Sequence, residues 1–461
     1  MLRKYNIVKP VTRSVAPTSI DSTTGNPAHD VVGTASLPIL AFILAHVLLA
    51  FAMRQLPAIG TAHAILVLGL GLLWVMRGDQ PERLACLAVY ITGAELLWRG
   101  TNATIYEFAK YSVSLLLILW LLKQRRHSRA GLRPTLYLVL LLPSIVVLPE
   151  FDREKVSFNL SGPLSLAISV MFFSTVRLGR FHMRQALVAG LAPIVGLAAI
   201  ALRSTLTTGE LEFSSNSNFV TSGGIGPNQV SALLGLGALL AILYLLIEPR
   251  SASLRLLMAV CAVWLTCQSA LTFSRGGLWT ALGALAVAVV YLARIRRLRM
   301  TFLFGAAATI AVGYFLVLPL LNDFTGGTLL ERFTDLDSTG RDHIAQADLQ
   351  VFADNPLLGV GPGQSRVARY ELLLQLESAH IEYTRLLSEH GIFGVLSLVV
   401  LLSMVVERFR KPAQPLDKAF VVAFTMWTLL YMLHAAMRLA APGVMFGLGS
   451  ATFALDEDAP V

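Results

Sequence analysis

Long apolar runs alternate with short polar segments along most of the chain. Each run approaches the roughly 20 residues that an α-helix needs to cross the hydrocarbon core of a bilayer. These runs predict spanning helices over residues 37–53, 58–76, 83–99, 104–122, 134–149, 160–178, 185–203, 229–247, 254–272, 276–294, 301–321, 392–407 and 419–437. A last run, over residues 442–455, is short and Gly-rich, which predicts a tilted or re-entrant helix. The pattern therefore predicts an all-α, polytopic membrane helix bundle with about 12 to 14 spans.

The composition supports the same fold class. Only 14% of the residues are charged, 55% are apolar, and the mean hydropathy is +0.66. An average soluble domain carries about 25% charged residues. These values exclude a soluble fold and make the lipid bilayer the expected solvent of the protein.

The distribution of cations predicts the orientation. The chain has 37 Lys and Arg residues against 28 Asp and Glu residues, a formal net charge of +9. In membrane proteins, Lys and Arg concentrate in the cytoplasmic loops. With a cytoplasmic N-terminus, about 24 of the 37 cations fall on that side. We therefore expect a multi-pass membrane protein with a cytoplasmic N-terminus, and the net charge needs no nucleic-acid partner to explain it.

The hydropathy pattern also predicts the domain organisation. We expect a polar cytoplasmic N-terminal tail (1–36), a transmembrane bundle (37–321), a periplasmic or outer loop (322–390), C-terminal transmembrane helices (391–455) and a short acidic tail (456–461). The loop is much longer than an ordinary connection, which is typical of a functional segment. Apolar spacing predicts short helices within it around LLERF at 329–333, around DHIAQADLQVF at 342–352 and over 372–389. GVGPG at 359–363 is expected to form a turn, because no Lys-Ser/Thr follows it as in a phosphate loop.

Several outer-facing cations are candidates for chemistry. Arg203 closes a predicted span, Arg275 lies in the turn SRGG, and Arg341 lies in the long loop. A cation at the edge of the hydrocarbon is costly unless it is paired or snorkels to the interface. Guanidinium groups donate bidentate hydrogen bonds that suit a phosphate or diphosphate. The alternative is snorkelling, or pairing with Asp323, Glu331, Asp335 or Asp337.

The segment SAHIEYTRLLSEHGIFG, at 378–394, is the most informative stretch of the chain. Read as a helix over 378–390, it places Glu382, Arg385 and Glu389 on one face, where they are expected to pair. His380 has no such local partner. An imidazole that titrates near neutrality can accept a proton from a sugar hydroxyl, which is general acid–base chemistry. The alternative for a lone histidine is a structural role.

The order of these motifs resembles the O-antigen ligase and polymerase superfamily. The motifs are GPNQ (226–229), SRGG (274–277), GR (340–341), NPLLGVGPG (355–363) and AHIEY through EHGIFG (379–394). Members of this superfamily are integral membrane glycosyltransferases that use undecaprenyl-diphosphate-linked glycans. The resemblance is clearest over residues 220–410, while the earlier helices match in hydropathy alone.

The resemblance implies roles for four residues. His380 matches the catalytic histidine, and Arg275 and Arg341 match arginines that hold the donor diphosphate; Arg203 is a weaker match to the same role. The family pattern places Asn, Ser or Gln after the histidine, then nine further residues, and then GxxG. Here the spacing to Gly391 is kept, but Ile381 replaces the polar neighbour. Any function that needs a side-chain amide at position 381 is therefore in doubt.

The function implied is transfer of an undecaprenyl-diphosphate-linked saccharide to an acceptor hydroxyl on the outer face, with polymerisation of a surface polysaccharide weakly preferred. Alternatives are a ligase that attaches O-antigen to lipid A-core and a protein O-oligosaccharyltransferase. Arginines can neutralise the charge that develops on the diphosphate, so we expect no cofactor and no metal.

A rival from another class is a flippase or transporter of lipid-linked sugars. Transporters carry ionisable residues near the bilayer midplane. Glu95 is the best candidate for such a residue.

Overall fold

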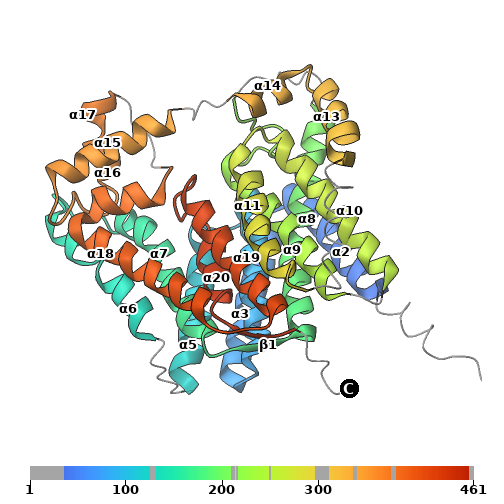
Figure 1. The fold of residues 1–461 in the computed structure, drawn as a ribbon, viewed down its shortest axis with the longest axis horizontal. Helices are drawn as coiled ribbons and strands as arrows, with labels where there is room; N and C mark the ends of the chain where they lie inside the picture. The colour runs from blue at the N-terminus through green and yellow to red at the C-terminus, as the bar shows by residue number, and fades with distance from the viewer. Residues whose placement is uncertain are drawn as a thin grey trace, which may run out of the picture.

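The computed structural model describes residues 36–124, 131–208, 213, 216–248, 251–295, 311–335, 340–374 and 380–455. Within these ranges the chain is a bundle of helices packed side by side (Figure 1). The prediction of an all-α, polytopic membrane protein is confirmed. The predicted tails, apart from Ser36, lie outside the described residues, and the domain division as a whole stays a prediction.

Eight of the described helices are long and apolar enough to cross a membrane. They are α2 (Ser36–Gln55), α3 (Pro57–Arg77), α7 (Arg153–Phe173), α8 (Arg180–Thr207), α9 (Pro227–Ile247), α10 (Ala252–Leu271), α11 (Arg275–Leu292) and α18 (Glu382–Arg410). Three others coincide with predicted spans but are shorter or more polar: α4 (Pro81–Gly100), α5 (Phe108–Gln124) and α19 (Pro415–Met432). The count of 12 to 14 spans stays a prediction.

Short elements replace parts of the predicted spans. The run at 134–149 forms α6 (Leu132–Val139) and the 3-10 helix η2 (Pro143–Val147), because Pro143 has no backbone N–H to continue α6. The run at 442–455 forms α20 (Ala441–Leu448) and the strand β2 (Thr452–Ala454), which pairs in parallel with β1 (Arg177–Gly179). Neither run is one long helix, and residues 301–310 of the span predicted at 301–321 lie outside the described residues.

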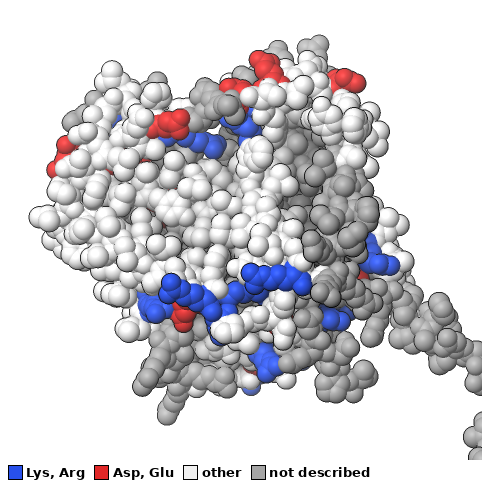
Figure 2. Space-filling view, viewed as in Figure 1, with Lys and Arg blue, Asp and Glu red and all other residues white. Residues whose placement is uncertain are grey.

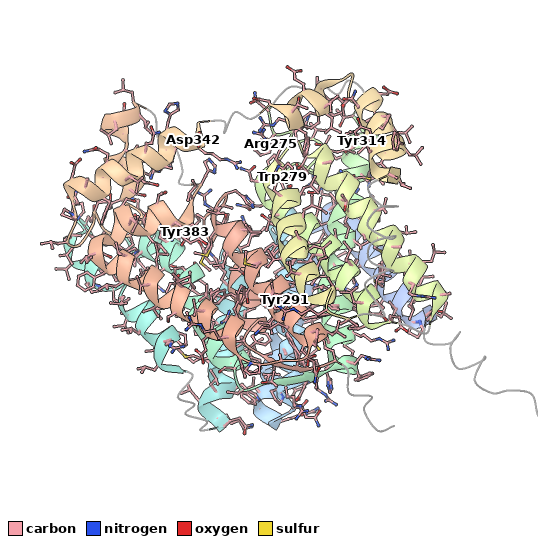
Figure 3. The ribbon with its side chains drawn as sticks, in the orientation of Figure 1. Arg275, Trp279, Tyr291, Tyr314, Asp342 and Tyr383 are labelled. Atoms are coloured by element: carbon pink, nitrogen blue, oxygen red, sulfur yellow. The ribbon has the colours of Figure 1, made fainter. Side chains whose placement is uncertain are left out.

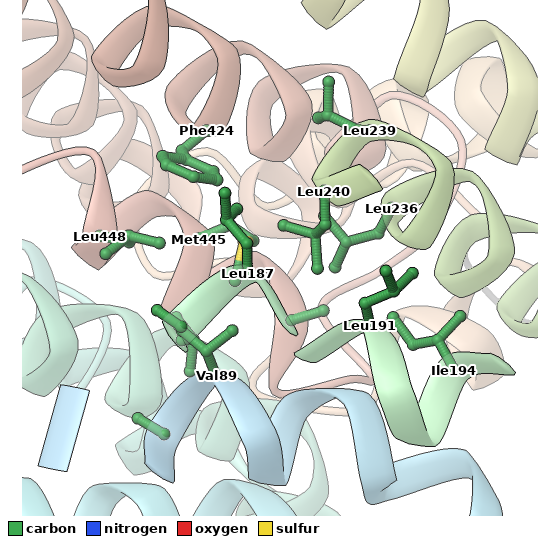
Figure 4. Close-up of a cluster of buried hydrophobic side chains, with 14 of the residues drawn as sticks. Val89, Leu187, Leu191, Ile194, Leu236, Leu239, Leu240, Phe424, Met445 and Leu448 are labelled. Carbon is green, nitrogen blue, oxygen red and sulfur yellow. The ribbon is translucent and has the colours of Figure 1, made fainter. Parts of the chain in front are cut away.

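The core forms where α4, α8, α9, α19 and α20 meet. Val89 of α4 packs toward Leu187 and Leu191 of α8, with Leu240 of α9 and Met445 of α20 beside them (Figure 4). These side chains are almost wholly buried. The core therefore fixes α9, whose first turn contributes to the site described below.

Short helices cover one end of the bundle, which we call the loop end. They are α13 (Leu318–Phe324), preceded by the π-helical turn η3 (Gly313–Val317), and α14 (Thr328–Thr334), α15 (Arg341–Asp354), α16 (Ser365–Ala368) and α17 (Tyr370–Leu373). The helices predicted around LLERF and DHIAQADLQVF are confirmed as α14 and α15. The helical stretch predicted over 372–389 is interrupted, since Leu374, His380 and Ile381 are not helical, α17 ends at Leu373 and α18 begins at Glu382. Residues 375–379 of this stretch lie outside the described residues. Figure 1 shows α13 and α14 above α8, α10 and α11, and α15 to α17 on the other side above α18.

A buried polar cluster anchors α15 to α18. Asp348 of α15 forms an ion pair with Arg369. It also accepts hydrogen bonds from Thr384 Oγ1 at 3.0 Å and Ser388 Oγ at 3.2 Å. Burial raises the pKa of the Asp348 carboxyl, while Arg369 and the two hydroxyls act in the opposite direction. The cluster therefore fastens the middle of α15 to α18.

The helix α18 bends sharply at Gly391. This residue has φ 57° and ψ −137°, a backbone conformation that glycine adopts readily. The GVGPG segment packs against the bend, where Val360 N donates to Ser388 O and Gly361 N donates to Glu389 O, both at 3.0 Å. GVGPG is therefore the turn that the sequence predicts, and it helps to position residues 382–390.

A second irregular segment, residues 433–440, separates α19 from α20. It falls at the end of the predicted span 419–437, which is therefore shorter than expected. Met437 N donates to Glu382 Oε2 at 3.2 Å, and Ala440 N donates to Glu95 Oε2 at 2.8 Å. We call residues 433–440 the unwound segment; carboxylates from α18 and α4 take two of its backbone donors.

Charge is unevenly distributed between the two ends. Figure 2 shows a band of Lys and Arg side chains toward the end opposite the loop end, and most of the acidic side chains in view at the loop end. A positive-inside protein with its loop end outside would have this distribution. The orientation itself stays a prediction.

Candidate functional site

The site lies at the loop end, where α9 and α11 begin side by side. Asn228 is the second residue of α9, and Ser274 immediately precedes α11. Ser274 Oγ donates a hydrogen bond to Asn228 Oδ1 at 2.8 Å, and Arg341 Nη2 donates to the same oxygen at 3.4 Å. Asn228 thus joins the GPNQ, SRGG and GR motifs, which are far apart in the sequence.

The two glycines of SRGG permit this close packing. A Cβ on Gly277 would lie 2.1 Å from the carbonyl oxygen of Ser231 in α9. A Cβ on Gly276 would lie 2.4 Å from Nδ1 of His434. Glycine at these positions lets α9 and α11 touch and leaves room for a histidine ring beside them.

Arg275, the first residue of α11, holds the end of α14. Its Nη1 donates to the main-chain carbonyl of Arg332 at 3.3 Å and also to that of Asp335. Arg332 Nε in turn donates to the carbonyl of Phe273 at 3.2 Å. The long loop is therefore fastened to the start of α11 by two guanidinium groups.

Arg341 completes a group of three arginines from α11, α14 and α15. Burial, followed by the nearby guanidinium groups of Arg332 and Arg275, lowers the pKa of Arg341. Three positive charges that lie close together repel one another. An anion placed among them would relieve that repulsion. Figure 3 shows Arg275 and Asp342, the neighbour of Arg341, on facing sides of the gap between the two groups of loop-end helices, and Figure 2 shows Lys and Arg side chains in this gap.

His380 lies just before α18 and is partly buried. Burial lowers the pKa of its imidazole to about 4, and the positive charges of Arg341, Arg438 and Arg369 act in the same direction. The imidazole is therefore neutral at physiological pH and has a ring nitrogen able to accept a proton.

Sequence reasoning did not select His434, a second histidine of the site. Its Nε2 lies 2.8 Å from Thr280 Oγ1, and its buried Nδ1 has no hydrogen-bond partner in the described structure. A signal was available: His434 precedes Arg438 by four residues at the C-terminal end of the predicted span 419–437. Within an apolar run, the type of residue alone did not distinguish it from a packing histidine.

A cavity of about 200 Å³, which we call the first cavity, is lined by Asn228, His380 and His434 among others. Its lining residues are Ser217, Phe219, Gly226, Pro227, Asn228, Gln229, His380, Tyr431, His434, Ala435, Ala436 and Arg438. His380 lines it directly, and Arg341 reaches it by contact with Asn228. Arg275 lies near Arg341 and does not line the cavity.

Arg203 lies apart from this group. It is near the C-terminal end of α8 and exposed, with its guanidinium carbon 5.6 Å from the centre of the Phe51 ring. Within the described part of the chain, no hydrogen bond or ion pair joins Arg203 to Arg275, Arg341 or His380. The structure thus brings three of the four predicted site residues together.

The predicted pairing on α18 is confirmed. Arg385 forms ion pairs with Glu382 and, at 2.6 Å, with Glu389. Ser365 Oγ donates to Glu389 Oε1 at 3.0 Å. All three charged side chains are nearly fully buried, so this network supports the segment that follows His380.

Replacing Arg385 by methionine is expected to destabilise the protein by about 3–5 kcal/mol, because two buried carboxylates would lose their cation. Thermal unfolding of the purified protein in detergent measures this effect. Arg153→Met is the matched control, since Arg153 is an exposed arginine at the start of α7. Equal unfolding temperatures for the two variants would contradict the role given to the network.

No group of three or more His, Cys, Asp or Glu side chains that could hold a metal ion occurs among the described residues. The positive charge at the first cavity comes from arginines. The absence of a metal from the reaction stays a prediction.

The fold and site define a polytopic membrane protein with a histidine and several arginines around a cavity at one end. A family model described as O-Antigen ligase matches residues 260–399. The match confirms the predicted resemblance to the O-antigen ligase and polymerase superfamily. The matched segment contains Arg275, Arg341 and His380. No curated protein matches the chain.

Proposed function

We propose that the protein is a glycosyltransferase that passes an undecaprenyl-diphosphate-linked saccharide to an acceptor hydroxyl on the outer face of the bacterial inner membrane. The observation that carries this proposal is the position of neutral His380 beside a group of arginines, at a cavity where three family motifs meet. A phosphate-binding group and a proton acceptor are the two functions that such a transfer requires.

The reaction follows from this arrangement. A ring nitrogen of His380 takes the proton of the acceptor hydroxyl as its oxygen attacks the anomeric carbon of the donor saccharide. A new carbon–oxygen bond forms to the acceptor, and the bond to the diphosphate breaks with its electron pair leaving on the diphosphate. Arg341 contacts the leaving group and stabilises the growing negative charge. Arg275 and Arg332 hold α14 in place and add positive charge behind Arg341.

Within this class we prefer a polymerase of surface polysaccharide to a ligase that attaches O-antigen to lipid A-core or a protein O-oligosaccharyltransferase. The preference rests on the long loop and the HIEY and SEHG pattern. Loss of the gene in the source bacterium is expected to leave single repeat units on the lipid carrier. Mass analysis of the lipid-linked saccharides tests this, and long chains retained on the carrier would instead indicate a ligase.

The contacts of Glu95 support a structural role for this residue. Its Oε1 lies 3.5 Å from Arg99 Nη1, and its Oε2 accepts a hydrogen bond from the backbone of the unwound segment. A carboxylate engaged in this way supports the fold. The observation favours the transferase over a flippase or transporter for lipid-linked sugars.

A further inference from the structure

A second and larger cavity adjoins the first. Its volume is about 850 Å³, within the range of pockets that enclose ligands of several rings. Its lining residues are Ile105, Tyr106, Glu107, Tyr111, Glu154, Lys155, Ser157, Phe158, Asn159, Gly363, Ser365, Arg366, Val367, Arg385, Glu389, Ala436, Met437 and Arg438. Ala436 and Arg438 of the unwound segment line both cavities, so a ligand in the second cavity can reach the first past these residues.

The two cavities differ in charge. The ionisable residues that line the first are two histidines and Arg438, besides the phenol of Tyr431, and Arg341 stands next to them. Three carboxylates and four cations line the second, together with hydroxyl and amide groups. A mixed set of donors and acceptors suits a ligand that carries many hydroxyls. The first cavity therefore fits an anion, and the second fits an uncharged polar ligand.

Aromatic rings add a second feature to this lining. The ring centres of Tyr106 and Phe158 lie 5.2 Å apart. Arg99 places its guanidinium carbon 3.5 Å from the centre of the Tyr106 ring and so fixes its position. Aromatic rings offer large, rigid apolar surfaces, and the C–H face of a sugar ring packs on such a surface while its hydroxyls bond to polar groups at the edge.

Hydrogen bonds join this aromatic pair to the first cavity. Gln229 Nε2 donates to the Tyr106 hydroxyl at 3.0 Å, and Arg99 Nη2 donates to Gln229 Oε1 at 2.8 Å. Gln229 itself lines the first cavity. These hydrogen bonds therefore connect the aromatic pair of the second cavity to the lining of the first cavity, which includes His380.

We propose that the second cavity binds the acceptor saccharide, with sugar rings packed on Phe158 and Tyr106 and the reacting hydroxyl directed past Arg438 toward His380. This inference rests on the proposed transferase function. Tyr106, Tyr111 and Phe158 lie on or beside α5 and α7, outside the segment 260–399 that the family model matches. The aromatic part of the proposed acceptor site therefore lies in a part of the chain that the family match does not cover, while residues of α16 and α18 within the matched segment complete the cavity.

Equilibrium binding to the full chain in detergent tests the proposal with two probes. One is a mixture of neutral oligosaccharides released by mild acid from the surface polysaccharide of the source bacterium, followed by saturation-transfer NMR. The other is inorganic diphosphate, followed by calorimetry. Phe158→Ala is expected to weaken oligosaccharide binding at least tenfold and to leave diphosphate binding within twofold of the unsubstituted protein. Tyr111→Ala, which removes a partly exposed ring from the same cavity, is expected to act in the same direction.

Phe151→Ala is the matched control, because Phe151 is exposed and does not line the cavity. Should Phe158→Ala fail to fold, Tyr111→Ala decides the outcome. Failure of the unsubstituted protein to bind the oligosaccharides would overturn the acceptor site. The same holds if both cavity variants bind the oligosaccharides as tightly as the unsubstituted protein does. If the transfer reaction still depended on His380 and Arg341 in that case, the proposed function would stand alone. If instead transfer did not depend on either residue, the proposed function would fall and the acceptor assignment with it.

Discussion

Alanine in place of His380 is expected to slow saccharide transfer by about 10²–10⁴-fold, the usual contribution of a positioned general base. The imidazole is neutral, lines the first cavity and has a nearby group of arginines to hold the leaving group. Product formed by the purified protein from lipid-linked saccharide measures the effect. His343→Ala is the matched control, since His343 is exposed on α15 only two residues from Arg341. Unchanged transfer by the His380 variant would remove this residue from the reaction.

The rate of saccharide transfer is expected to fall at low pH. A general base works only when unprotonated, and burial, with help from Arg341, Arg438 and Arg369, lowers the pKa of His380 to about 4. The rate at low substrate concentration should therefore be constant down to about pH 5 and fall through pH 4 as the imidazole gains a proton. Removing the positive charge at position 341 raises this pKa, so the falling limb in Arg341→Gln should shift upward. A limb at the ordinary histidine value of 6.5 in the unsubstituted protein would contradict the assignment.

The second large effect is expected at Arg341. Replacing it by glutamine should slow transfer by about 10²–10³-fold, comparable to the loss of one donor that stabilises charge in a transition state. Lysine at this position keeps the charge but lacks the planar fork of hydrogen-bond donors, so Arg341→Lys should recover only part of the rate. Transfer rates and the calorimetric affinity for inorganic diphosphate together measure the effect.

Two other arginines make the comparison specific. Arg153→Gln removes an exposed cation near the loop end and should change neither quantity. Arg203→Gln tests the weaker match in the sequence, and a loss of diphosphate affinity there would restore Arg203 to the donor site. Arg275→Gln is expected to lower both the rate and the unfolding temperature, because Arg275 also holds the main chain of α14. Full activity of Arg341→Gln would contradict the diphosphate assignment.

The sequence was a good guide wherever a local pattern controls structure. Apolar runs predicted the bundle, and i, i+3 and i+4 spacing predicted the pairing of Arg385 with Glu382 and Glu389. It was a poorer guide where a proline or a distant partner interrupts a run. Residues 134–149 read as one span but break at Pro143, and residues 442–455 end in a strand that pairs with residues 177–179.

The sequence likewise predicted one part of the candidate site and missed another. Motif order predicted that Arg275, Arg341 and His380 act together, and the structure brings them near one cavity. His434 was missed because its importance depends on Gly276, which lies far away in the sequence and leaves space for the ring. The second cavity was missed because it combines side chains of α5, α7, α18 and the unwound segment, and no local spacing relates them.

The unwound segment also has a consequence for reaction fidelity. Irregular backbone within a membrane protein is tolerated where it lines a water-filled space, and Ala436 and Arg438 of the unwound segment line both cavities. The first cavity, at about 200 Å³, has room for several water molecules. Water is itself a nucleophile with a hydroxyl proton for His380 to accept. A transferase with such a water-filled cavity would slowly hydrolyse its donor whenever no acceptor is bound, so its yield of transfer product would depend on how fast the acceptor displaces water.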